Sequence, residues 1–217
     1  MLFLSGGGSG GKSKEIDSAF IKSLDKSKPV LYIPLAREAP YEPCLVWIKN
    51  NFASYRFNNI KMVNNFNELK SIDLKNYSGV YIGGGNTFKL LMELREAGFM
   101  NKLIAYHKSN GIIAGGSAGA IIFGKSIKSS PDSNEVKLKD FAGANLVREF
   151  SIACHFDEKE EQFLLDLVRT KKEKIIALPE DSGIIVSKKG SIVCGKGNVY
   201  LLEEKEKNIL KPGQKIW

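Results

Sequence analysis

The sequence predicts an α/β protein, a three-layer sandwich with a mostly parallel central sheet and helices on both faces. Short apolar runs alternate along the chain with segments of helical periodicity, which is typical of parallel strands joined by crossover helices. A length of 217 residues, of which 43% are hydrophobic and 26% charged, suffices for one sizeable core. The sequence contains no repeat, low-complexity tract or obvious linker, so we expect residues 1–217 to form a single domain.

The expected strands are short apolar runs bounded by turn residues. In chain order they are Leu2–Leu4, Val30–Ile33, Ile60–Val63, Gly79–Ile82, Gly111–Ala114, Ser151–Ala153, Ile175–Leu178, Gly183–Val186, Ile192–Cys194 and Val199–Leu202. The last three lie close together in the chain and are joined by turn residues such as Lys188–Gly190. We therefore expect these three strands to form an antiparallel meander at the end of the chain.

The expected helices carry their apolar residues at helical spacing. In chain order they are Lys14–Leu24, Pro43–Phe57, Thr87–Ala97, Met100–Ser109 and Lys159–Lys171. Residues 125–145 have weak periodicity and many polar side chains. We expect a long irregular excursion there, and long loops in compact domains are often functional.

A serine flanked by small residues follows one of the expected strands. Residues Gly115–Ala120 (GGSAGA) come directly after the apolar run Gly111–Ala114. Their Gly-x-Ser-x-Gly pattern is typical of a nucleophile elbow, a strained strand-to-helix turn that exposes a serine oxygen, in this chain that of Ser117. Taken alone, the segment fits a tight turn packed with small residues equally well.

Adjacent glycines follow another expected strand. Gly83–Thr87 (GGGNT) come after Gly79–Ile82 and open the next expected helix. Glycines at the end of a strand expose backbone N–H groups, which can stabilise the oxyanion that develops in acyl transfer. Alone, this segment fits a phosphate loop or a plain tight turn better.

Two histidines are the candidates for a general base. His107 lies within the expected helix Met100–Ser109 among lysines, and we expect it on a solvated helix surface. His155 follows the expected strand Ser151–Ala153, and the end of a strand is a good position for a general base. A lone histidine is more often structural than catalytic, so the case for His155 depends on the other motifs.

Residues Gly6–Ser13 (GGGSGGKS) match the phosphate-binding pattern Gly-x-x-x-x-Gly-Lys-Ser between an expected strand and an expected helix. The alternative function is therefore nucleotide binding, with Lys12 facing the phosphates and Ser13 facing magnesium. A run of glycines satisfies this pattern easily, and the next three expected strands end without the acid that would hold the metal. The structural alternative is a flexible loop in which Ser13 caps the following helix.

Composition limits the possible partners. The net charge is +8, but the lysines are spread along the chain, so we expect a solvated lysine-rich surface and no nucleic-acid partner. The cysteines, Cys44, Cys154 and Cys194, lack metal-ligand spacing, and we expect neither a metal nor a cofactor. The sequence shows no membrane-spanning stretch and no convincing secretory signal. We expect a cytoplasmic protein with no membrane partner.

Four blocks of the sequence stand in a set order. They are Gly83–Phe88, Gly116–Ala120, His155–Phe156 and Leu178–Glu180. Together they resemble the signature motifs of the dipeptidase E and cyanophycinase family of serine peptidases, which includes alpha-aspartyl dipeptidases. The resemblance spans roughly Val30 to Leu202, and its specificity comes mainly from the first two blocks.

The resemblance implies a glutamine-amidotransferase-like α/β sandwich that carries a peptidase site. Ser117 would be the nucleophile, His155 its base, and Gly85 and Ala118 the donors of the oxyanion N–H groups. These roles agree with general chemistry, because a serine hydroxyl is a weak nucleophile until a neighbouring base takes its proton. The implied reaction is hydrolysis of peptide bonds in small peptides through an acyl-enzyme.

The acid that orients His155 has more than one candidate. The Leu178–Glu180 block points to Glu180. The family also has an important acid in the excursion after the nucleophile helix, where Asp132 and Glu135 are the nearest candidates and neither falls into register. We predict Glu180.

One segment departs from the family pattern. Members that remove N-terminal aspartyl residues use an arginine after the catalytic histidine, whereas this chain has the acidic segment Asp157–Glu161 (DEKEE). Such a segment would repel an acidic substrate. The sequence therefore predicts serine-peptidase chemistry and leaves aspartyl specificity doubtful. A third interpretation is a non-catalytic relative that binds a ligand, which the presence of serine, histidine and acid together disfavours.

Overall fold

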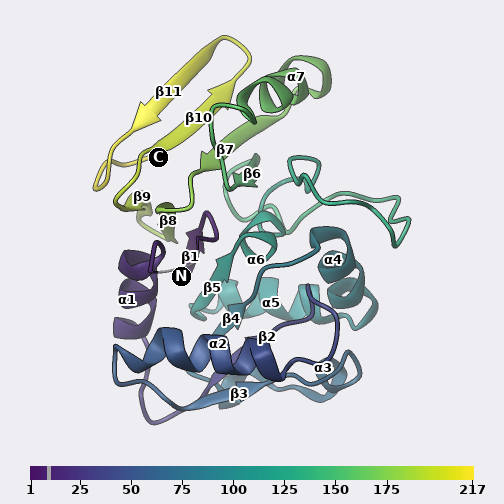
Figure 1. Ribbon diagram of the computed structural model, residues 1–217, viewed down its shortest axis with the longest axis vertical. Helices are drawn as coiled ribbons and strands as arrows, with labels where there is room; N and C mark the ends of the chain where they lie inside the picture. Colours follow the sequence, from purple (N-terminus) through teal and green to yellow (C-terminus); the bar gives the residue numbers. More distant parts are fainter. Residues whose placement is uncertain (9–10) are drawn as a thin grey trace.

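The structure, a computed structural model, describes residues 1–8 and 11–217. It contains two β-sheets with helices packed against them (Figure 1). The larger sheet has seven strands in the order β3-β2-β4-β5-β1-β8-β9, and the smaller has four in the order β11-β10-β7-β6. The predicted α/β class, with a central multi-stranded sheet and flanking helices, is confirmed.

Five parallel strands form the body of the larger sheet, and an antiparallel hairpin extends one edge. The strands are β1 (Leu2–Ser5), β2 (Val30–Ile33), β3 (Ile60–Met62), β4 (Gly79–Ile82), β5 (Ile113–Gly116), β8 (Ser182–Ser187) and β9 (Gly190–Gly195). Strand β1 pairs in parallel with β5 and antiparallel with β8. The predicted parallel order therefore holds for the first five strands.

Helices cover both faces of the larger sheet. They are α1 (Lys14–Lys22), α2 (Glu42–Ala53), α4 (Thr87–Glu96) and α5 (Phe99–Lys108), together with the short α3 (Glu68–Ser71), α6 (Ala118–Ile121) and the 3₁₀ turn η1 (Leu74–Asn76). Because side chains alternate along a strand, Phe3 and Tyr81 pack with α1 and α2. Leu4 and Ile82 face the opposite way and pack with α4 and α5.

The smaller sheet makes the predicted terminal meander wrong. Its strands are β6 (Phe150–Cys154), β7 (Lys174–Leu178), β10 (Val199–Glu203) and β11 (Glu206–Leu210), and α7 (Glu161–Lys171) packs against it. Strands β8 and β9 form a hairpin in the larger sheet, but β10 pairs with β7 and β11. The physical reason is burial, because Leu202 of β10 completes the apolar core that Leu164 and Val168 of α7 form.

Strand β11 was not among the expected strands. Its sequence, EKNIL, is mostly charged or polar, and its first four residues are exposed. It pairs with β10 alone, at the edge of the smaller sheet. An edge strand that buries neither face needs no alternating apolar pattern, so the sequence carried no signal for it.

The carboxyl ends of β4, β5 and β1 lie side by side, because these strands are parallel neighbours in the sheet. The loop Gly6–Ser13, the glycine turn Gly83–Asn86 and Ser117 follow these three strand ends. In open parallel sheets, ligand sites are built from such loops at the carboxyl edge. The fold therefore gathers three separate sequence motifs at one edge.

Candidate active site

Ser117 lies at the turn between β5 and α6, with φ 54° and ψ −124°. This backbone conformation is costly for a residue with a Cβ. Packing explains the small neighbours. A Cβ on Gly115 would lie 2.1 Å from the carbonyl oxygen of Gly119, and one on Gly119 would lie 2.2 Å from that of Ile82. Larger side chains would therefore separate the turn from β4.

His155 lies within hydrogen-bonding distance of this serine. Its Nε2 is 2.8 Å from Oγ of Ser117, although the two residues are 38 positions apart in the chain. His155 follows β6 of the smaller sheet, and its backbone N–H donates to the carbonyl of Gly6 at 3.1 Å. The ring is thereby held where the two sheets meet. A base at this distance can take the hydroxyl proton directly.

Glu180 lies on the other side of the imidazole. Its Oε1 is 3.0 Å from Nδ1 of His155, and it follows β7, which is the parallel neighbour of β6. The side chains of His155 and Glu180 are 42% and 38% exposed. Ser117, His155 and Glu180 thus form one continuous hydrogen-bonded chain that reaches the surface.

Lys12 is a member of this cluster that the sequence analysis assigned to a different site. Its Nζ lies 2.6 Å from Oε2 of Glu180, so the carboxylate binds the lysine with one oxygen and the histidine with the other. The hydrogen bond from Lys12, followed by that from His155, lowers the pKa of Glu180 below its ordinary value. The sequence signal that could have placed Lys12 in this site is that its loop, Gly6–Ser13, directly follows β1.

The glycine turn after β4 lies against the serine side chain. A Cβ on Gly84 would lie 3.5 Å from Oγ of Ser117, which places the glycine turn against the serine. Gly85 has φ 147° and lies against the carbonyl of Ala36, where a Cβ would come within 2.2 Å of the oxygen. The N–H groups of Gly84, Gly85 and Ala118 donate to no acceptor within residues 1–8 and 11–217. These N–H groups are available to an oxygen of a ligand.

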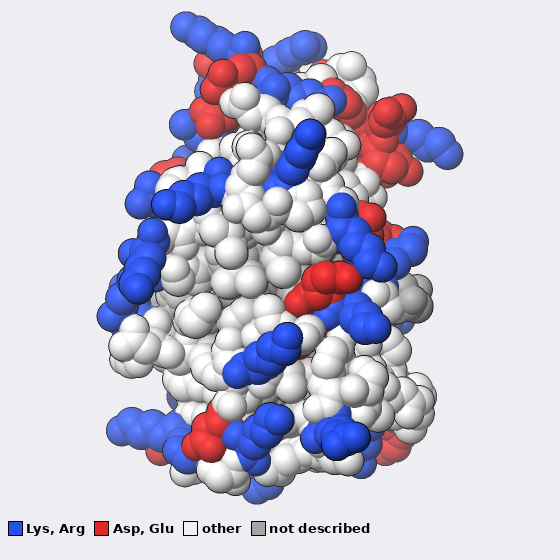
Figure 2. Space-filling model, turned by 90° about the vertical axis from the view of Figure 1, so that its left-hand side faces the viewer, with Lys and Arg blue, Asp and Glu red and all other residues white. Residues whose placement is uncertain are grey.

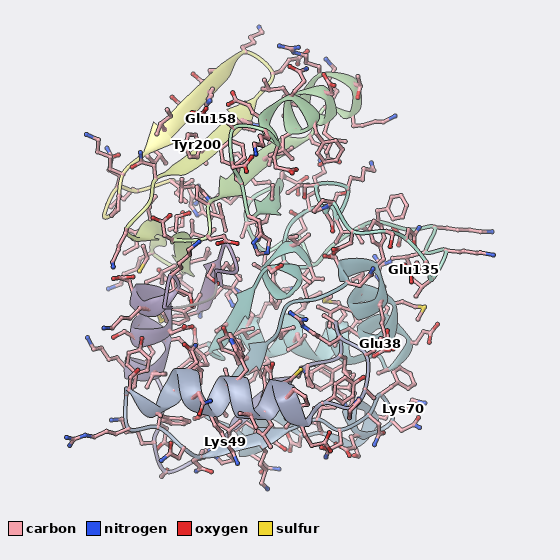
Figure 3. All side chains as sticks on the ribbon, viewed as in Figure 1. Glu38, Lys49, Lys70, Glu135, Glu158 and Tyr200 are labelled. Atoms are coloured by element: carbon pink, nitrogen blue, oxygen red, sulfur yellow. The ribbon has the colours of Figure 1, made fainter. Side chains whose placement is uncertain are left out.

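The two alternative acids form hydrogen bonds with other residues and not with the histidine. Oδ2 of Asp132 accepts hydrogen bonds from the backbone N–H of Thr87 at 2.8 Å, from its hydroxyl at 2.6 Å and from Ser130 at 2.9 Å. Asp132 therefore ties the excursion to the start of α4, next to the glycine turn. Glu135 is exposed on the excursion (Figure 3) and accepts from Ser133. Of the three candidate acids, the structure places Glu180, the predicted one, within hydrogen-bonding distance of His155.

The loop Gly6–Ser13 lies against the serine and the histidine. Its residues Ser9 and Gly10 lie outside the described residues. A Cβ on Gly7 would lie 2.6 Å from Cβ of Ser117 and 3.0 Å from Nε2 of His155. The expectation that Ser13 caps α1 is wrong for its side chain. Its hydroxyl donates instead to Asp17 at 2.8 Å.

This arrangement disfavours the nucleotide-binding interpretation. A phosphate loop would direct the Lys12 ammonium to phosphate and the Ser13 hydroxyl to magnesium. In the structure, Lys12 is paired with Glu180 and Ser13 is bonded to Asp17. Both side chains are therefore engaged within the protein.

The acidic segment after the histidine has a local structural role. The carboxylate of Asp157 accepts the backbone N–H of Lys159 at 2.7 Å and of Glu160 at 3.3 Å. Asp157 also lines a cavity of about 650 Å³ with Lys12 and Lys196, so acidic and basic groups face this cavity together. Glu158 is exposed in the segment between β6 and α7 (Figure 3).

His107 is not on a solvated surface as expected. It is half-buried, and burial lowers its pKa to about 4. Its Nδ1 is buried and has no hydrogen-bond partner among the described residues. The helical pattern predicted the helix but not its packing near the amino group of Met1. The positive charge of that amino group also lowers the pKa of His107.

Metal-ligand clusters, membrane-spanning helices and charged patches would indicate other kinds of site. Within residues 1–8 and 11–217, no group of three or more His, Cys, Asp or Glu side chains is placed to hold a metal ion. None of the helices described is both long and apolar enough to cross a membrane. On the face shown in Figure 2, basic side chains are spread from end to end, with acidic and uncharged surface between them.

A cavity of about 510 Å³ opens beside Ser117 and His155. It extends past the glycine turn to the segment between β2 and α2, and its lining includes Tyr32, Trp47 and Tyr81. This volume is in the usual range for small-molecule sites, about 300–1,000 Å³. The candidate nucleophile therefore lies in the wall of a cavity of suitable size for a small ligand.

Comparison with solved structures identifies the fold. A crystal structure of a peptidase from an acI-B1 Actinobacterium superposes with a TM-score of 0.73 and 20% identity, covering 99% of this chain and 95% of that one. A putative Peptidase E protein from Listeria monocytogenes EGD-e gives a TM-score of 0.67 and 21% identity, covering 88% of this chain and 96% of that one. The fold is therefore that of a class of α/β peptidases.

Comparison of sequences identifies the family. The family model of peptidase family S51 matches residues 1–194, and the chain belongs to this family. Peptidase E from Escherichia coli O1:K1 / APEC is 31% identical over 146 residues. Peptidase E from Shigella boydii serotype 18 matches to the same extent. These matches span 63% of this chain and 63% of the length of the curated relatives. The predicted resemblance to the dipeptidase E family is confirmed.

Proposed function

We propose that the chain is a serine peptidase that hydrolyses peptide bonds in small peptides through an acyl-enzyme on Ser117. The observation that carries the proposal is the hydrogen-bonded chain from Ser117 Oγ through His155 to Glu180, at 2.8 and 3.0 Å. A serine, an imidazole and a carboxylate in this sequence of contacts activate a hydroxyl on several unrelated folds. Membership of peptidase family S51 supports the same reaction.

The proposed reaction has two halves. Oγ of Ser117 attacks the peptide carbonyl while Nε2 of His155 takes its proton, and a tetrahedral oxyanion forms. As the C–N bond breaks, the imidazolium returns that proton to the leaving amine, and an ester remains on Ser117. His155 then takes a proton from a water molecule that attacks the ester carbonyl. As the C–Oγ bond breaks, the imidazolium gives that proton to Oγ of Ser117, which releases the acid and restores the enzyme. Glu180 holds the imidazole in one tautomer and stabilises the imidazolium in both halves.

The oxyanion would be bound by the N–H groups of Gly85 and Ala118. Ala118 is the first residue of α6, so its N–H also lies at the positive end of that turn. An oxyanion donor of this kind lowers the barrier by about 3–4 kcal/mol. Thr87, the residue after the glycine turn Gly83–Asn86, is held in place because its N–H and its hydroxyl both donate to Asp132.

The local fold supports two finer assignments. We propose that Ser117, at φ 54° between a strand and a helix, forms a nucleophile elbow. We also propose that the larger sheet, with helices on both faces, is glutamine-amidotransferase-like. We also propose that residues 1–217 act as one domain, because the largest apolar cluster contains Leu4 of the larger sheet and Ile176 of the smaller. The non-catalytic alternative gains no support from a site whose three side chains are all in contact.

A small peptide library tests the proposal. Dipeptides and tripeptides, Asp-X peptides included, are incubated with the purified chain, and new amino groups are measured, while a fluorophosphonate probe reports a reactive serine. We expect hydrolysis of short peptides and covalent labelling at Ser117. If the folded protein neither hydrolyses any peptide nor reacts with the probe, the peptidase proposal is wrong.

Replacing Lys12 with glutamine should change the acid side of the pH profile. The lysine holds the pKa of Glu180 below its ordinary value of 4.5, so the carboxylate stays charged as the pH falls. Without the lysine, that pKa rises and Glu180 is protonated at a higher pH. We expect the slope of log kcat/KM against pH to steepen below about pH 5 in Lys12→Gln, because two protonations then remove activity.

The matched control for this variant is Lys196→Gln. Lys196 lines the cavity of about 650 Å³ together with Lys12, but its ammonium forms no hydrogen bond with Glu180. Its pH profile should keep the slope of the parent enzyme. Identical profiles for Lys12→Gln and the parent would show that Lys12 does not control the charge of Glu180.

A further inference from the structure

The cavity beside Ser117 has aromatic walls. Tyr81 of β4 lies against Trp47 of α2 with ring centroids 6.2 Å apart, and against Tyr32 of β2 at 6.0 Å. Trp47 is 41% exposed, which is unusual for so large an apolar side chain. Burial raises the pKa of both tyrosines, so their rings stay neutral in the physiological range. These walls suit an apolar side chain and disfavour a charged one.

The aromatic walls adjoin the reacting groups. A Cβ on Gly83 would lie 3.0 Å from the hydroxyl of Tyr32, and one on Gly116 would lie 3.8 Å from that of Tyr81. Gly83 lies two residues before the proposed oxyanion donor Gly85, and Gly116 directly precedes the nucleophile. A side chain placed against these rings would therefore belong to a residue next to the bond that is cut.

Arg37 is the one lysine or arginine among the described residues that line this cavity. Within residues 1–8 and 11–217, no carboxylate lies within salt-bridge distance of its guanidinium. The lining also includes Glu38, but that side chain is 84% exposed and its carboxylate lies 3.8 Å from Lys89. The guanidinium is thus the charge available to a ligand, and it suits a carboxylate.

The loop that carries Arg37 is fixed to the glycine turn. Nζ of Lys89 donates to the carbonyls of Leu35 at 2.8 Å and Arg37 at 2.9 Å. The N–H of Asn86 donates to the carbonyl of Ala36 at 2.7 Å. The backbone of Arg37 therefore keeps a set position relative to the proposed oxyanion donors, as a specificity residue requires.

We propose that this cavity takes the C-terminal residue of a short peptide, with its apolar side chain against the exposed ring of Trp47 and its free carboxylate on Arg37. This inference rests on the proposed peptidase function and names its substrate class. An apolar side chain and a carboxylate occur on one residue at the C-terminus of a peptide. The leaving group of the reaction is then a free apolar amino acid, and an acidic side chain is not required.

The test compares four peptides, Ala-Phe, Ala-Phe amide, Ala-Ala and Asp-Phe amide, by kcat/KM with the full chain. We expect Ala-Phe to exceed its amide by roughly 10–100-fold, the usual worth of a charge-assisted hydrogen bond. Arg37→Gln should remove this difference by raising KM for Ala-Phe with kcat little changed. Trp47→Ala should lower the preference for Ala-Phe over Ala-Ala.

Lys49→Gln is the matched control, because Lys49 is an exposed cation on α2 outside the cavity lining (Figure 3). It should behave as the parent enzyme, and all variants should react equally with the fluorophosphonate probe. Labelling and hydrolysis with equal rates for Ala-Phe and its amide would overturn the cavity assignment and leave the peptidase function standing. The cavity assignment would also be wrong if Arg37→Gln lowered kcat/KM only for Asp-Phe amide. Loss of both labelling and hydrolysis in the parent would remove both proposals.

Discussion

Replacing Ser117 with alanine is expected to reduce kcat/KM for small peptides by roughly 10⁴–10⁶-fold. The hydroxyl whose oxygen lies 2.8 Å from Nε2 of His155 is the only group in the proposed reaction that forms a covalent bond to substrate. Without it, the remaining groups can only bind the peptide and polarise its carbonyl. Peptide hydrolysis and covalent labelling by the fluorophosphonate probe measure the loss, and both should vanish together.

The fold should survive this change, so the loss can be read as chemistry. Alanine keeps the Cβ that already occupies the strained φ of 54° at this turn, and the variant removes only a half-buried hydroxyl. The melting temperature should stay close to that of the parent. Ser71→Ala, an exposed serine far from the site in the sequence, is the matched control and should retain activity. Peptidase activity that persists in Ser117→Ala would move the nucleophile elsewhere.

The strands that sequence patterns located best are those buried on both faces. Strands β2 and β4 occupy the residues expected, Val30–Ile33 and Gly79–Ile82, because continuous apolar runs end at Pro, Ser or Gly. The division into two sheets was not predicted. An apolar run reports that a strand is buried but not which strand it pairs with, so β10 was assigned to the wrong neighbours.

The site shows a similar limit. The motifs led to Ser117, His155 and Glu180 as candidates, and the structure places these three in contact. They did not lead to Lys12, because its glycine-rich loop satisfies a phosphate-binding pattern that implies other contacts. Nor did they lead to Arg37 and Trp47, whose approach to Ser117 depends on how α2 packs over β2 and β4. A short sequence motif predicts the backbone geometry of its own segment, whereas the residues that line a cavity are set by tertiary packing.

Replacing Glu180 with glutamine is expected to lower kcat by roughly 10²–10³-fold. The amide is isosteric but carries no charge, so it stabilises the imidazolium less and permits the wrong tautomer of His155. The loss should be smaller than the roughly 10⁴-fold found for a buried orienting acid. The reason is that the side chains of His155 and Glu180 are 42% and 38% exposed, so water can partly replace the carboxylate.

Asp132→Asn and Glu135→Gln decide between the three candidate acids when measured beside Glu180→Gln. Asp132 contacts Thr87 rather than the histidine, so we expect a smaller loss of kcat, an unchanged pH profile and a loss of about 1 kcal/mol in the free energy of unfolding. Glu135 is exposed and bonds Ser133, so Glu135→Gln should match the parent. A full loss in Asp132→Asn with an altered pH profile, together with an active Glu180→Gln, would transfer the orienting role to Asp132. Such a result would require the Asp132 carboxylate to reach His155 when substrate binds, whereas in this structure its Oδ2 accepts three hydrogen bonds from Thr87 and Ser130.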